Sequence, residues 1–202
     1  MVRPRADNYE QRRQAILDAA ATLFARESFA GTSIASIAQL CGASKALLYH
    51  YYSSKEALLY DMLSAHCKML EETARNAVNA DQPAEIALQS LIRNLMNVYI
   101  SSRDKHIVLL NDLGALPMEQ QAQIKELQRS VVLVIKNLLV QLRPELHPTE
   151  QTSLAMYLMG AINWTYTWFN TEGPISAQQY ADMATSLFLN GVRGTQVTVP
   201  HH

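Results

Sequence analysis

Hydroxyl and cationic side chains gather at three expected helix starts within residues 32–56. Free N–H groups and the positive end of the helix dipole make a helix start a binding place for phosphate. Lys55 falls in the first turn of its helix, where a cation opposes the dipole, and an external phosphate would account for it. The chemistry predicted for this segment is therefore phosphate binding. The hydroxyl residues are Thr32, Ser33, Ser44 and Ser53.

Three expected helices position these side chains. Apolar residues at helical spacing predict a first helix from Tyr9 to Glu27, and Thr32 or Ser33 begins a second, short helix that ends at Gly42. Ser44 begins a third helix that runs to about Tyr51. This order is typical of a helix-turn-helix, in which the second short helix enters the major groove of DNA. Its spacing leaves Lys45, Ala46, Tyr49 and His50 to project outwards and Leu47, Leu48 and Tyr52 to face the core.

Each of these features also has an ordinary structural explanation. Serines at helix starts are common caps, a lysine is common on a solvated surface, and tyrosines are common in a core. Their order and spacing together are more specific than any one of them.

Charge is distributed unevenly along the 202 residues. Residues 1–55 hold seven Lys and Arg against four Asp and Glu, whereas the other 147 residues hold ten against fourteen, giving a total of −1. Basic residues near the start, Arg3, Arg5, Arg12 and Arg13, are placed to reach neighbouring phosphates or the minor groove. The asymmetry is a pointer towards a polyanion at one end of the molecule.

Composition excludes several classes of protein. With 49% hydrophobic and 17% charged residues, the chain is neither disordered nor a coiled coil. Cys41 and Cys67 have no metal-ligand spacing around them, so free thiols and no metal or other cofactor are expected. Neither a secretory signal nor an uncharged membrane-spanning stretch is found, and we expect a cytoplasmic protein.

Helical periodicity continues through the rest of the chain and predicts an all-α fold of about nine helices. Ser53 with Glu56 forms an expected capping box for the fourth helix, and strand-like alternation is confined to residues 195–199. We expect two domains, a helix-turn-helix domain over 1–55 and a helical effector-binding and dimerisation domain over 56–202. The later helices are expected at about 53–78, 83–99, 103–113, 117–143, 148–170 and 176–191.

Residues 13–59 resemble the DNA-binding domain of the TetR/AcrR family of bacterial one-component repressors. The matching positions include Ile16, Ala19, Ala20, Leu23, Phe24, Phe29, Gly31, Thr32, the helix from Ile34 to Ala38, Gly42, Ser44, the run Leu48 to Tyr52, Lys55, Glu56, Leu58 and Leu59. The resemblance implies a homodimer on an operator DNA of two-fold symmetry. It also implies phosphate contacts at Thr32, Ser33, Tyr49, Tyr51 and Lys55, and base or groove contacts at Ser44, Lys45 and Ala46, with His50 where the family varies. Tyr52 departs from the commoner phenylalanine.

For residues 60–202 the resemblance is looser, and it implies a dimer interface built by the last two helices and a cavity for a small-molecule effector. The helix expected at 148–170 has two apolar faces, one with Tyr157, Trp164 and Trp168 and another with Leu158, Ile162 and Thr165, and the sequence leaves open which face meets the partner. The effector domain is similar to branches of the family that respond to CoA thioesters, with Arg93, Arg103 or Lys105 as candidates for the CoA phosphates. The predicted ligand-binding residues are Met62, His66, Met96, Tyr99, Arg103, Trp164 and Trp168.

The predicted function is a ligand-responsive transcriptional repressor that leaves its operator when a small hydrophobic effector, an acyl-CoA or aryl-CoA, binds. An alternative with the same DNA-binding helices is a multidrug-type sensor of hydrophobic cations, for which Asp112 and Glu85 are the available carboxylates. Activator action is left open. Catalysis is not expected, because no nucleophile, metal or phosphate-loop motif stands out, and an all-α enzyme acting on a thioester is the alternative from another class.

Overall fold

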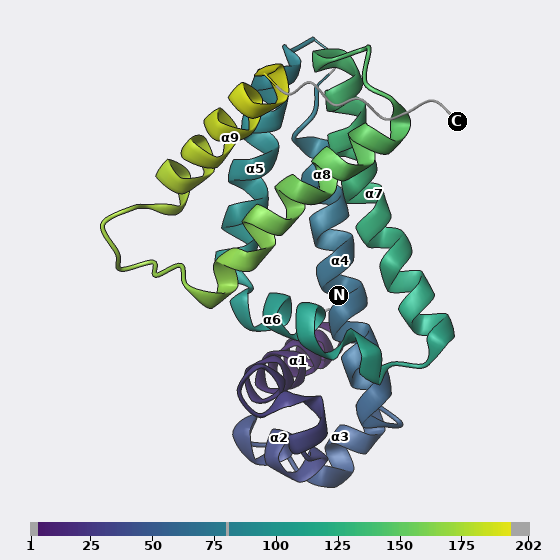
Figure 1. The fold of residues 1–202 in the computed structure, drawn as a ribbon. Helices are drawn as coiled ribbons and strands as arrows, with labels where there is room; N and C mark the ends of the chain where they lie inside the picture. The colour runs from purple at the N-terminus through teal and green to yellow at the C-terminus, as the bar shows by residue number, and fades with distance from the viewer. Residues whose placement is uncertain (1–3, 80, 195–202) are drawn as a thin grey trace. The chain divides into compact units, whose positions relative to one another are not determined.

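The computed structural model describes residues 4–79 and 81–194, and its α-helices are joined by turns and loops (Figure 1). Within this part of the chain there are nine α-helices, two short 3-10 helices and no strand, so the all-α prediction is confirmed. The strand-like residues 195–199 lie outside the described residues.

The described residues fall into two compact units. The head unit comprises Met1–His66 and Asp104–Ile124, and the body unit comprises Cys67–Arg103 and Lys125–His202. The units interleave along the sequence because two long helices each contribute to both. A functional boundary near residue 55 stays a prediction.

The head unit contains the three helices that were expected first. They are α1 (Pro4–Gly31), α2 (Ile34–Leu40) and α3 (Lys45–Tyr51), followed by the first part of α4 (Lys55–Asn76), and later α6 (Arg103–Asp112), η1 (Leu113–Ala115) and the start of α7 (Met118–Leu142).

Local capping groups explain the short helices of the head unit. The Ser33 hydroxyl accepts a hydrogen bond from the Ser36 N–H at 3.0 Å, and the Ser44 hydroxyl accepts one from the Leu47 N–H at 3.1 Å. Gly42, with φ of 63°, occupies the left-handed region that the turn between them requires. These starts and this turn are as predicted.

The start of α4 differs from the expected capping box. The hydroxyl that accepts from the helix belongs to Ser54, which takes the Ala57 N–H at 3.0 Å, and α4 begins at Lys55. Two adjacent serines offer the same cap one residue apart, so the sequence alone did not decide between Ser53 and Ser54.

Helices α2 and α3 have seven residues each and need tertiary packing, since an isolated helix of this length is unstable in water. Their buried residues are Ile37 and Ala38 of α2 and Leu48 of α3, which are 0%, 4% and 1% exposed. Helix α2 packs against α1 and α3, and the predicted apolar stripe of α1, which includes Ile16, Ala20 and Phe24, is at most 2% exposed. This small core fixes the short helices.

A half-buried carboxylate ties three helices of the head unit together. Arg13 of α1 donates to both oxygens of Asp61 of α4 at 2.6–3.1 Å, and the Tyr52 hydroxyl at the end of α3 donates to Asp61 at 2.6 Å. The bond to Asp61 raises the pKa of Arg13, and burial raises the pKa of the Tyr52 phenol. Arg13, which was expected to reach phosphates, is therefore engaged within the head unit.

Helix α1 extends beyond its expected end at Glu27 and is broken at Ser28. Ser28 has φ of 62° and ψ of 165°, a region populated almost only by glycine, at a cost of about 1–3 kcal/mol for other residues. The Ser28 carbonyl accepts from the Thr32 hydroxyl at 2.9 Å, and the following N–H, that of Phe29, donates to Asp112 at 3.1 Å. Surrounding contacts thus hold a strained residue just before α2.

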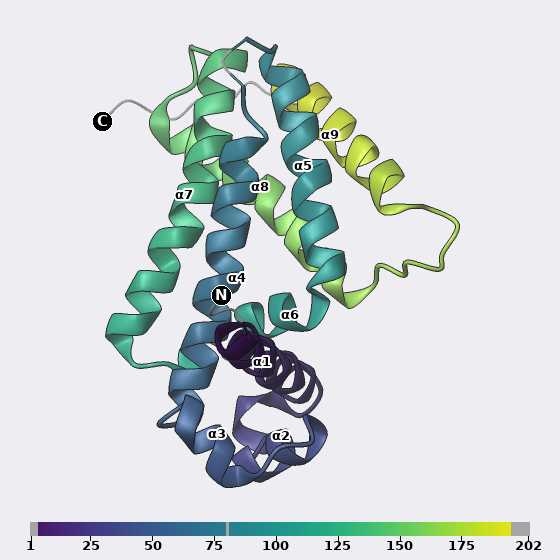
Figure 2. The same cartoon turned by 180° about the vertical axis from the view of Figure 1, so that it is seen from behind.

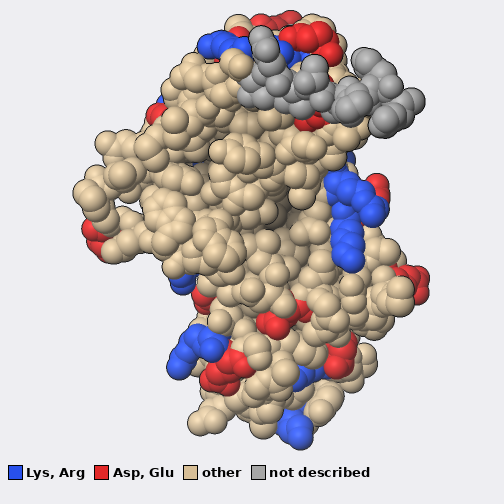
Figure 3. Space-filling view, in the orientation of Figure 1, with Lys and Arg blue, Asp and Glu red and all other residues tan. Residues whose placement is uncertain are grey.

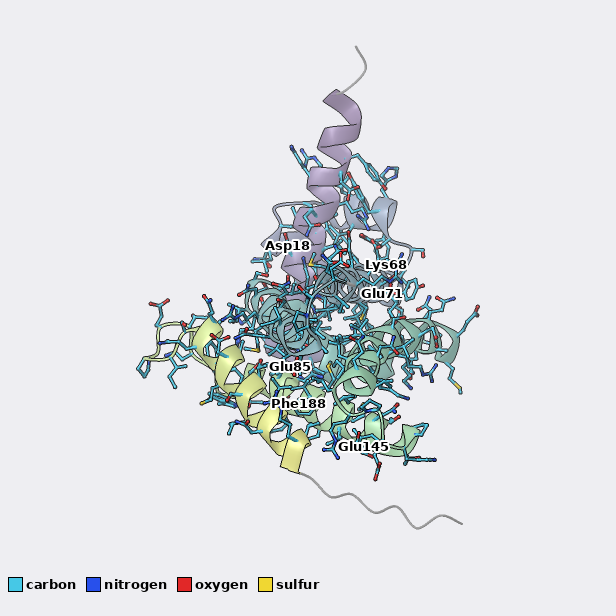
Figure 4. The ribbon with its side chains drawn as sticks, turned by 90° about the horizontal axis from the view of Figure 1, so that it is seen from above. Asp18, Lys68, Glu71, Glu85, Glu145 and Phe188 are labelled. Carbon is cyan, nitrogen blue, oxygen red and sulfur yellow. The ribbon has the colours of Figure 1, made fainter. Side chains whose placement is uncertain are left out.

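The body unit is built around α5 and α9, which run side by side (Figure 2). Arg93 of α5 donates twice to Asp182 of α9, at 2.6 and 2.7 Å. Phe188, on the inner side of α9, is 4% exposed (Figure 4). The elements of the body unit are the second part of α4, α5 (Ala84–Ser101), the second part of α7, α8 (Pro148–Asn163), η2 (Trp164–Thr167) and α9 (Ala177–Gly194).

Helix α8 is shorter than predicted, since the α-helix ends at Asn163 rather than Asn170. The next four residues form η2, in which the Thr165 hydroxyl donates to the Ile162 carbonyl at 2.6 Å and the Thr167 hydroxyl donates to the Trp164 carbonyl at 2.8 Å. Threonine hydroxyls that bond to nearby carbonyls compete with the regular helix ladder. The apolar periodicity of the sequence continues beyond Asn163, so it did not reveal where the α-helix ends.

Two histidines meet in the interior of the head unit. His66 of α4 and His106 of α6 are each 2% exposed, with 3.4 Å between Nε2 of His66 and Nδ1 of His106. Burial lowers the pKa of His66 to about 4 and that of His106 to about 3, with smaller contributions from Lys105 and from the neighbouring histidine. Both rings are therefore neutral in the folded protein at pH 7.

Acid is expected to destabilise the head unit before most carboxylates titrate. Below pH 6.5 the unfolded chain binds protons at these histidines and the folded chain does not, so stability falls as pH falls. The loss between pH 7 and pH 5 is about 2 kcal/mol for each histidine. Urea unfolding followed by far-UV circular dichroism at the two pH values measures it. A His66→Gln/His106→Gln variant is the matched control and should show a smaller loss; an equal loss would contradict this assignment.

Candidate nucleic-acid interface

Helix α3 presents one face to solvent. Lys45, Ala46, Tyr49 and His50 are exposed, while Leu48 is buried and Leu47 is partly covered. This is the orientation predicted from the spacing. The Lys45 ammonium lies 5.9 Å from the centre of the Tyr49 ring, so the cation and the phenol form one exposed group.

An open groove of about 480 Å³ borders this face. It lies between the start of α2, the first turns of α3 and the start of α4, so side chains from three helices converge on it. Five residues that were predicted to contact DNA line it together. The lining residues are Thr32, Ser33, Ile34, Ala35, Lys45, Tyr49, Ser53, Ser54, Lys55 and Glu56.

The predicted hydroxyl contacts divide into exposed and buried groups. Ser33 and Ser44 are exposed, and their oxygens already accept the N–H groups of their own helices. Thr32 is only 2% exposed, and its hydroxyl donates to the Ser28 carbonyl. The structure therefore leaves Ser33 and Ser44 at the surface, whereas the Thr32 side chain serves the turn between α1 and α2.

Lys55 has internal partners that the sequence did not reveal. Its ammonium donates to the Phe29 carbonyl at 2.6 Å and to the Thr32 carbonyl at 2.8 Å, and it lies 4.2 Å from the centre of the Phe29 ring. Carbonyls at a helix end attract a cation, because they carry the negative end of the dipole. These contacts, rather than an external phosphate, account for a lysine in the first turn of α4.

Tyr51 is held by an aromatic contact with α1. Its ring stacks on Tyr9 at 4.6 Å between centroids, and His50 meets it edge-on at 5.8 Å. Tyr51 is partly exposed, whereas Tyr9 and His50 are exposed. This stack joins the N-terminal part of α1 to the end of α3, and no spacing rule in the sequence predicted it.

The residues predicted to bind an effector fall in both units. In the head unit, Met62 and His66 are buried. In the body unit, Met96 and Tyr99 of α5 are buried, and burial raises the pKa of Tyr99. Arg103 is exposed and donates to the Tyr166 carbonyl at 2.9 Å.

The structure shows which apolar face of α8 and η2 is covered. Leu158, Ile162 and Thr165 are buried, and the Thr165 hydroxyl lies 3.9 Å from the sulfur of Met96. On the opposite face Trp164 and Trp168 are 63% and 55% exposed. Met96 and Tyr99 are buried whereas these tryptophans are exposed, and a ligand site that joins all four residues stays a prediction.

Family comparisons match both parts of the chain. The family described as "Bacterial regulatory proteins, tetR family" matches residues 16–62, and the one described as "Tetracyclin repressor-like, C-terminal domain" matches residues 81–192. The chain belongs to the TetR family of transcriptional regulators. The predicted resemblance is confirmed, and the members of this family are regulators rather than enzymes.

Solved TetR-family structures share the fold. A TetR-family regulator from Bordetella parapertussis is 36% identical with a TM-score of 0.85, over 92% of this chain and 98% of that one. AibR, solved with isovaleryl coenzyme A and operator DNA, is 27% identical with a TM-score of 0.76, over 87% and 97%. Among curated relatives, the transcriptional repressor KstR2 of Mycobacterium tuberculosis is 24% identical over 196 residues, or 93% of this chain and 96% of KstR2.

None of the described helices has the length and apolar character that crossing a membrane requires. The described residues also contain no group of three or more His, Cys, Asp or Glu side chains placed to hold a metal ion.

The two lysines of the groove are expected to act differently on DNA. A lysine at a groove edge also lies beside the DNA backbone, where its charge neutralises a phosphate and releases a counterion. Lys45→Met should therefore reduce the slope of log affinity against log salt by about 0.9 for each bound protomer. Lys55→Met should weaken binding and leave the slope unchanged, because the Lys55 ammonium is occupied by two carbonyls. Fluorescence anisotropy at four salt concentrations measures both. A reduced slope for Lys55→Met would show instead that Lys55 reaches a phosphate in the complex.

Proposed function

We propose that this chain is a ligand-responsive repressor. It binds a palindromic operator as a homodimer and leaves the DNA when an acyl-CoA or aryl-CoA binds the helical domain. The observation that carries the proposal is the exposed face of α3 beside a groove lined by α2, α3 and α4, in a TetR-family chain. AibR, with its isovaleryl coenzyme A and operator DNA, supports the two ligands, and KstR2 supports repression.

In the proposed complex α3 enters the major groove of DNA. Lys45 and Ala46 meet groove edges, because they are exposed at the start of α3, where a recognition helix contacts bases. Ser33, Ser44 and Tyr49 contact phosphates beside them, and His50 contacts a neighbouring base or phosphate. Thr32 and Lys55 support this surface through the carbonyls they bind, and Tyr51 supports it through its stack on Tyr9.

Arg103 is the cation that we propose for a CoA phosphate. Arg93 is bound by Asp182, and Lys105 pairs with Asp18 at 2.8 Å, so both charges have acidic partners. Arg103 takes part in no ion pair within the described part of the chain. One of its N–H groups donates a hydrogen bond to the Tyr166 carbonyl. A guanidinium with donors to spare suits phosphate, because it can bind two oxygens at once. Met96 and Tyr99 are proposed to contact the acyl group.

The cationic-effector alternative loses its two candidate carboxylates. Asp112 accepts the Phe29 N–H, and Glu85 pairs with Arg193 at 3.2 Å. Both carboxylates thus have partners within the chain, which favours the CoA-thioester proposal over a cationic effector. The family match to transcriptional regulators favours the repressor over a thioester enzyme.

An uncharged face of the body unit is proposed as the subunit interface. Large apolar side chains on α8, η2 and α9 are exposed there, and Figure 3 shows a largely uncharged surface over α8 and α9. Exposed apolar area of this kind marks an interaction site. The tryptophans are therefore assigned to the interface rather than to the ligand. The residues are Met156 (55% exposed), Tyr157 (70%), Trp164 (63%), Trp168 (55%), Met183 (45%) and Leu187 (68%).

A charge on this face is expected to separate the subunits. Leu187→Glu should convert a dimer of 22.6 kDa chains into monomers, because association would bury two carboxylates near each other. Size-exclusion chromatography with light scattering measures the mass. Leu133→Glu, on an exposed position of α7 (54%), is the control and should remain dimeric. A dimeric Leu187→Glu variant would place the interface elsewhere.

DNA release by a CoA thioester tests the whole proposal. The protein should bind a DNA fragment from upstream of its own gene, and isovaleryl-CoA should weaken that binding by about 5- to 150-fold, the usual range of allosteric coupling. Gel-shift titration with and without the thioester measures both affinities.

Two arginine variants refine this test. Arg103→Gln should need more thioester for the same release, whereas Arg93→Gln, whose ion pair is with Asp182, should respond like the wild type. Failure of the wild type to bind any fragment at low salt would refute the repressor. Binding without release by isovaleryl-CoA or a panel of acyl- and aryl-CoA esters would refute only the effector class.

A further inference from the structure

We propose that Asp112 and Lys55 are positioning residues for DNA binding, which hold the Phe29 peptide from two sides and so maintain the turn that begins the helix-turn-helix. The proposal rests on the DNA-binding function given above. Neither residue needs to touch DNA for this role. Both belong to the head unit, with Asp112 at the end of α6 and Lys55 at the start of α4.

The turn that they hold is strained. Ser28, with φ of 62° and ψ of 165°, is the one non-glycine residue at positive φ in the described chain. A residue other than glycine keeps these backbone angles only when contacts with the surrounding structure hold it there. Ser28 itself is exposed, so core packing of its side chain does not supply that constraint.

Contacts on the next peptide groups supply the constraint. The Phe29 N–H donates to Oδ2 of Asp112 at 3.1 Å, and the Phe29 carbonyl accepts from Lys55 at 2.6 Å. Lys55 also holds the Thr32 carbonyl at 2.8 Å, and its charge lies over the Phe29 ring. A carboxylate and an ammonium therefore hold the N–H and C=O groups of one residue, directly after the strained one.

The carboxylate is matched to this task. Desolvation raises the pKa of Asp112, while the Phe29 N–H and the Lys55 charge act against that rise. A partly buried carboxylate needs such partners, because an unpaired one would be costly. The Phe29 N–H and the Lys55 charge therefore stabilise the Asp112 carboxylate, and the carboxylate in turn holds the Phe29 peptide.

Displacement of this turn would reach the DNA-binding groove directly. Thr32 and Ser33, which follow the turn, and Lys55, which holds it, all line the groove beside Lys45 and Tyr49. Helix α6 also contacts α1 earlier, through Lys105 with Asp18 and through Thr22 with Asp104 at 2.9 Å. Those contacts lie on the regular part of α1, so they offer a matched control for the contact at the strained residue.

Operator affinity of Asp112 variants tests the proposal. With the DNA fragment from upstream of the gene, Asp112→Ala should bind about tenfold more weakly, which is the change expected when a hydrogen bond to a charged group is lost. Asp112→Asn should retain most of the affinity, because its amide oxygen can still accept the Phe29 N–H. Thr22→Val removes the Thr22 to Asp104 bond and should bind like the wild type. Circular dichroism melts confirm that each variant is folded.

A second background separates positioning from general stability. Glycine adopts the Ser28 conformation without strain, so Ser28→Gly should reduce the effect of Asp112→Ala to about twofold or less. The exchange rate of the Phe29 amide proton, measured by NMR, should rise in Asp112→Ala and not in Thr22→Val, with or without DNA.

Three results would overturn the proposal. One is wild-type affinity in a folded Asp112→Ala variant, and another is an equal loss in the Ser28→Gly background. The third is an unchanged Phe29 amide exchange rate in Asp112→Ala. Failure of the wild-type protein to bind DNA would be a different result, because it would refute the proposed function itself.

Discussion

One carboxylate, Asp61, determines how the helices of the head unit meet. It accepts hydrogen bonds from Arg13 of α1 and Tyr52 at the end of α3, while its own backbone belongs to α4. The Arg13 and Asp61 side chains are 26% and 31% exposed, so solvent weakens the net energy of the pair. Its larger effect is geometric, because a bidentate arginine and a short phenol bond fix both direction and distance. This anchor acts together with the small apolar core, which holds Ile37 of α2 and Leu48 of α3.

The same dependence on distant side chains extends to the backbone of the head unit. The carbonyls of Phe29 and Thr32 are satisfied by a lysine more than twenty positions further along the chain, and the Phe29 N–H by an aspartate of α6. Every such partner removes the cost of a buried, unpaired peptide group. It also makes the shape of the DNA-facing surface a property of the whole head unit rather than of the helix-turn-helix segment.

These long-range partners mark the limit of what the sequence predicts. Ser33, Gly42 and Ser44 act on residues within a few positions, and their helix ends were predicted correctly. Lys55, Thr32 and Arg13 were each predicted to contact phosphate, because a sequence shows the charge or hydroxyl but not the carbonyl or carboxylate that folding brings to it. His66 was similarly assigned to a ligand, while its contact with His106 spans forty positions. For α8, periodicity revealed two apolar faces, and only packing against α5 distinguishes the covered one.

The placement of Trp164 and Trp168 has a practical consequence. The chain has two tryptophans, and both lie in the body unit with more than half of each side chain exposed. Indole emission thus originates entirely outside the head unit and from rings whose surroundings change when that surface is covered. If subunits associate through the proposed interface, intrinsic fluorescence would report that association. Helices α1, α2 and α3 have tyrosine and phenylalanine as their aromatic residues, so they contribute no tryptophan emission.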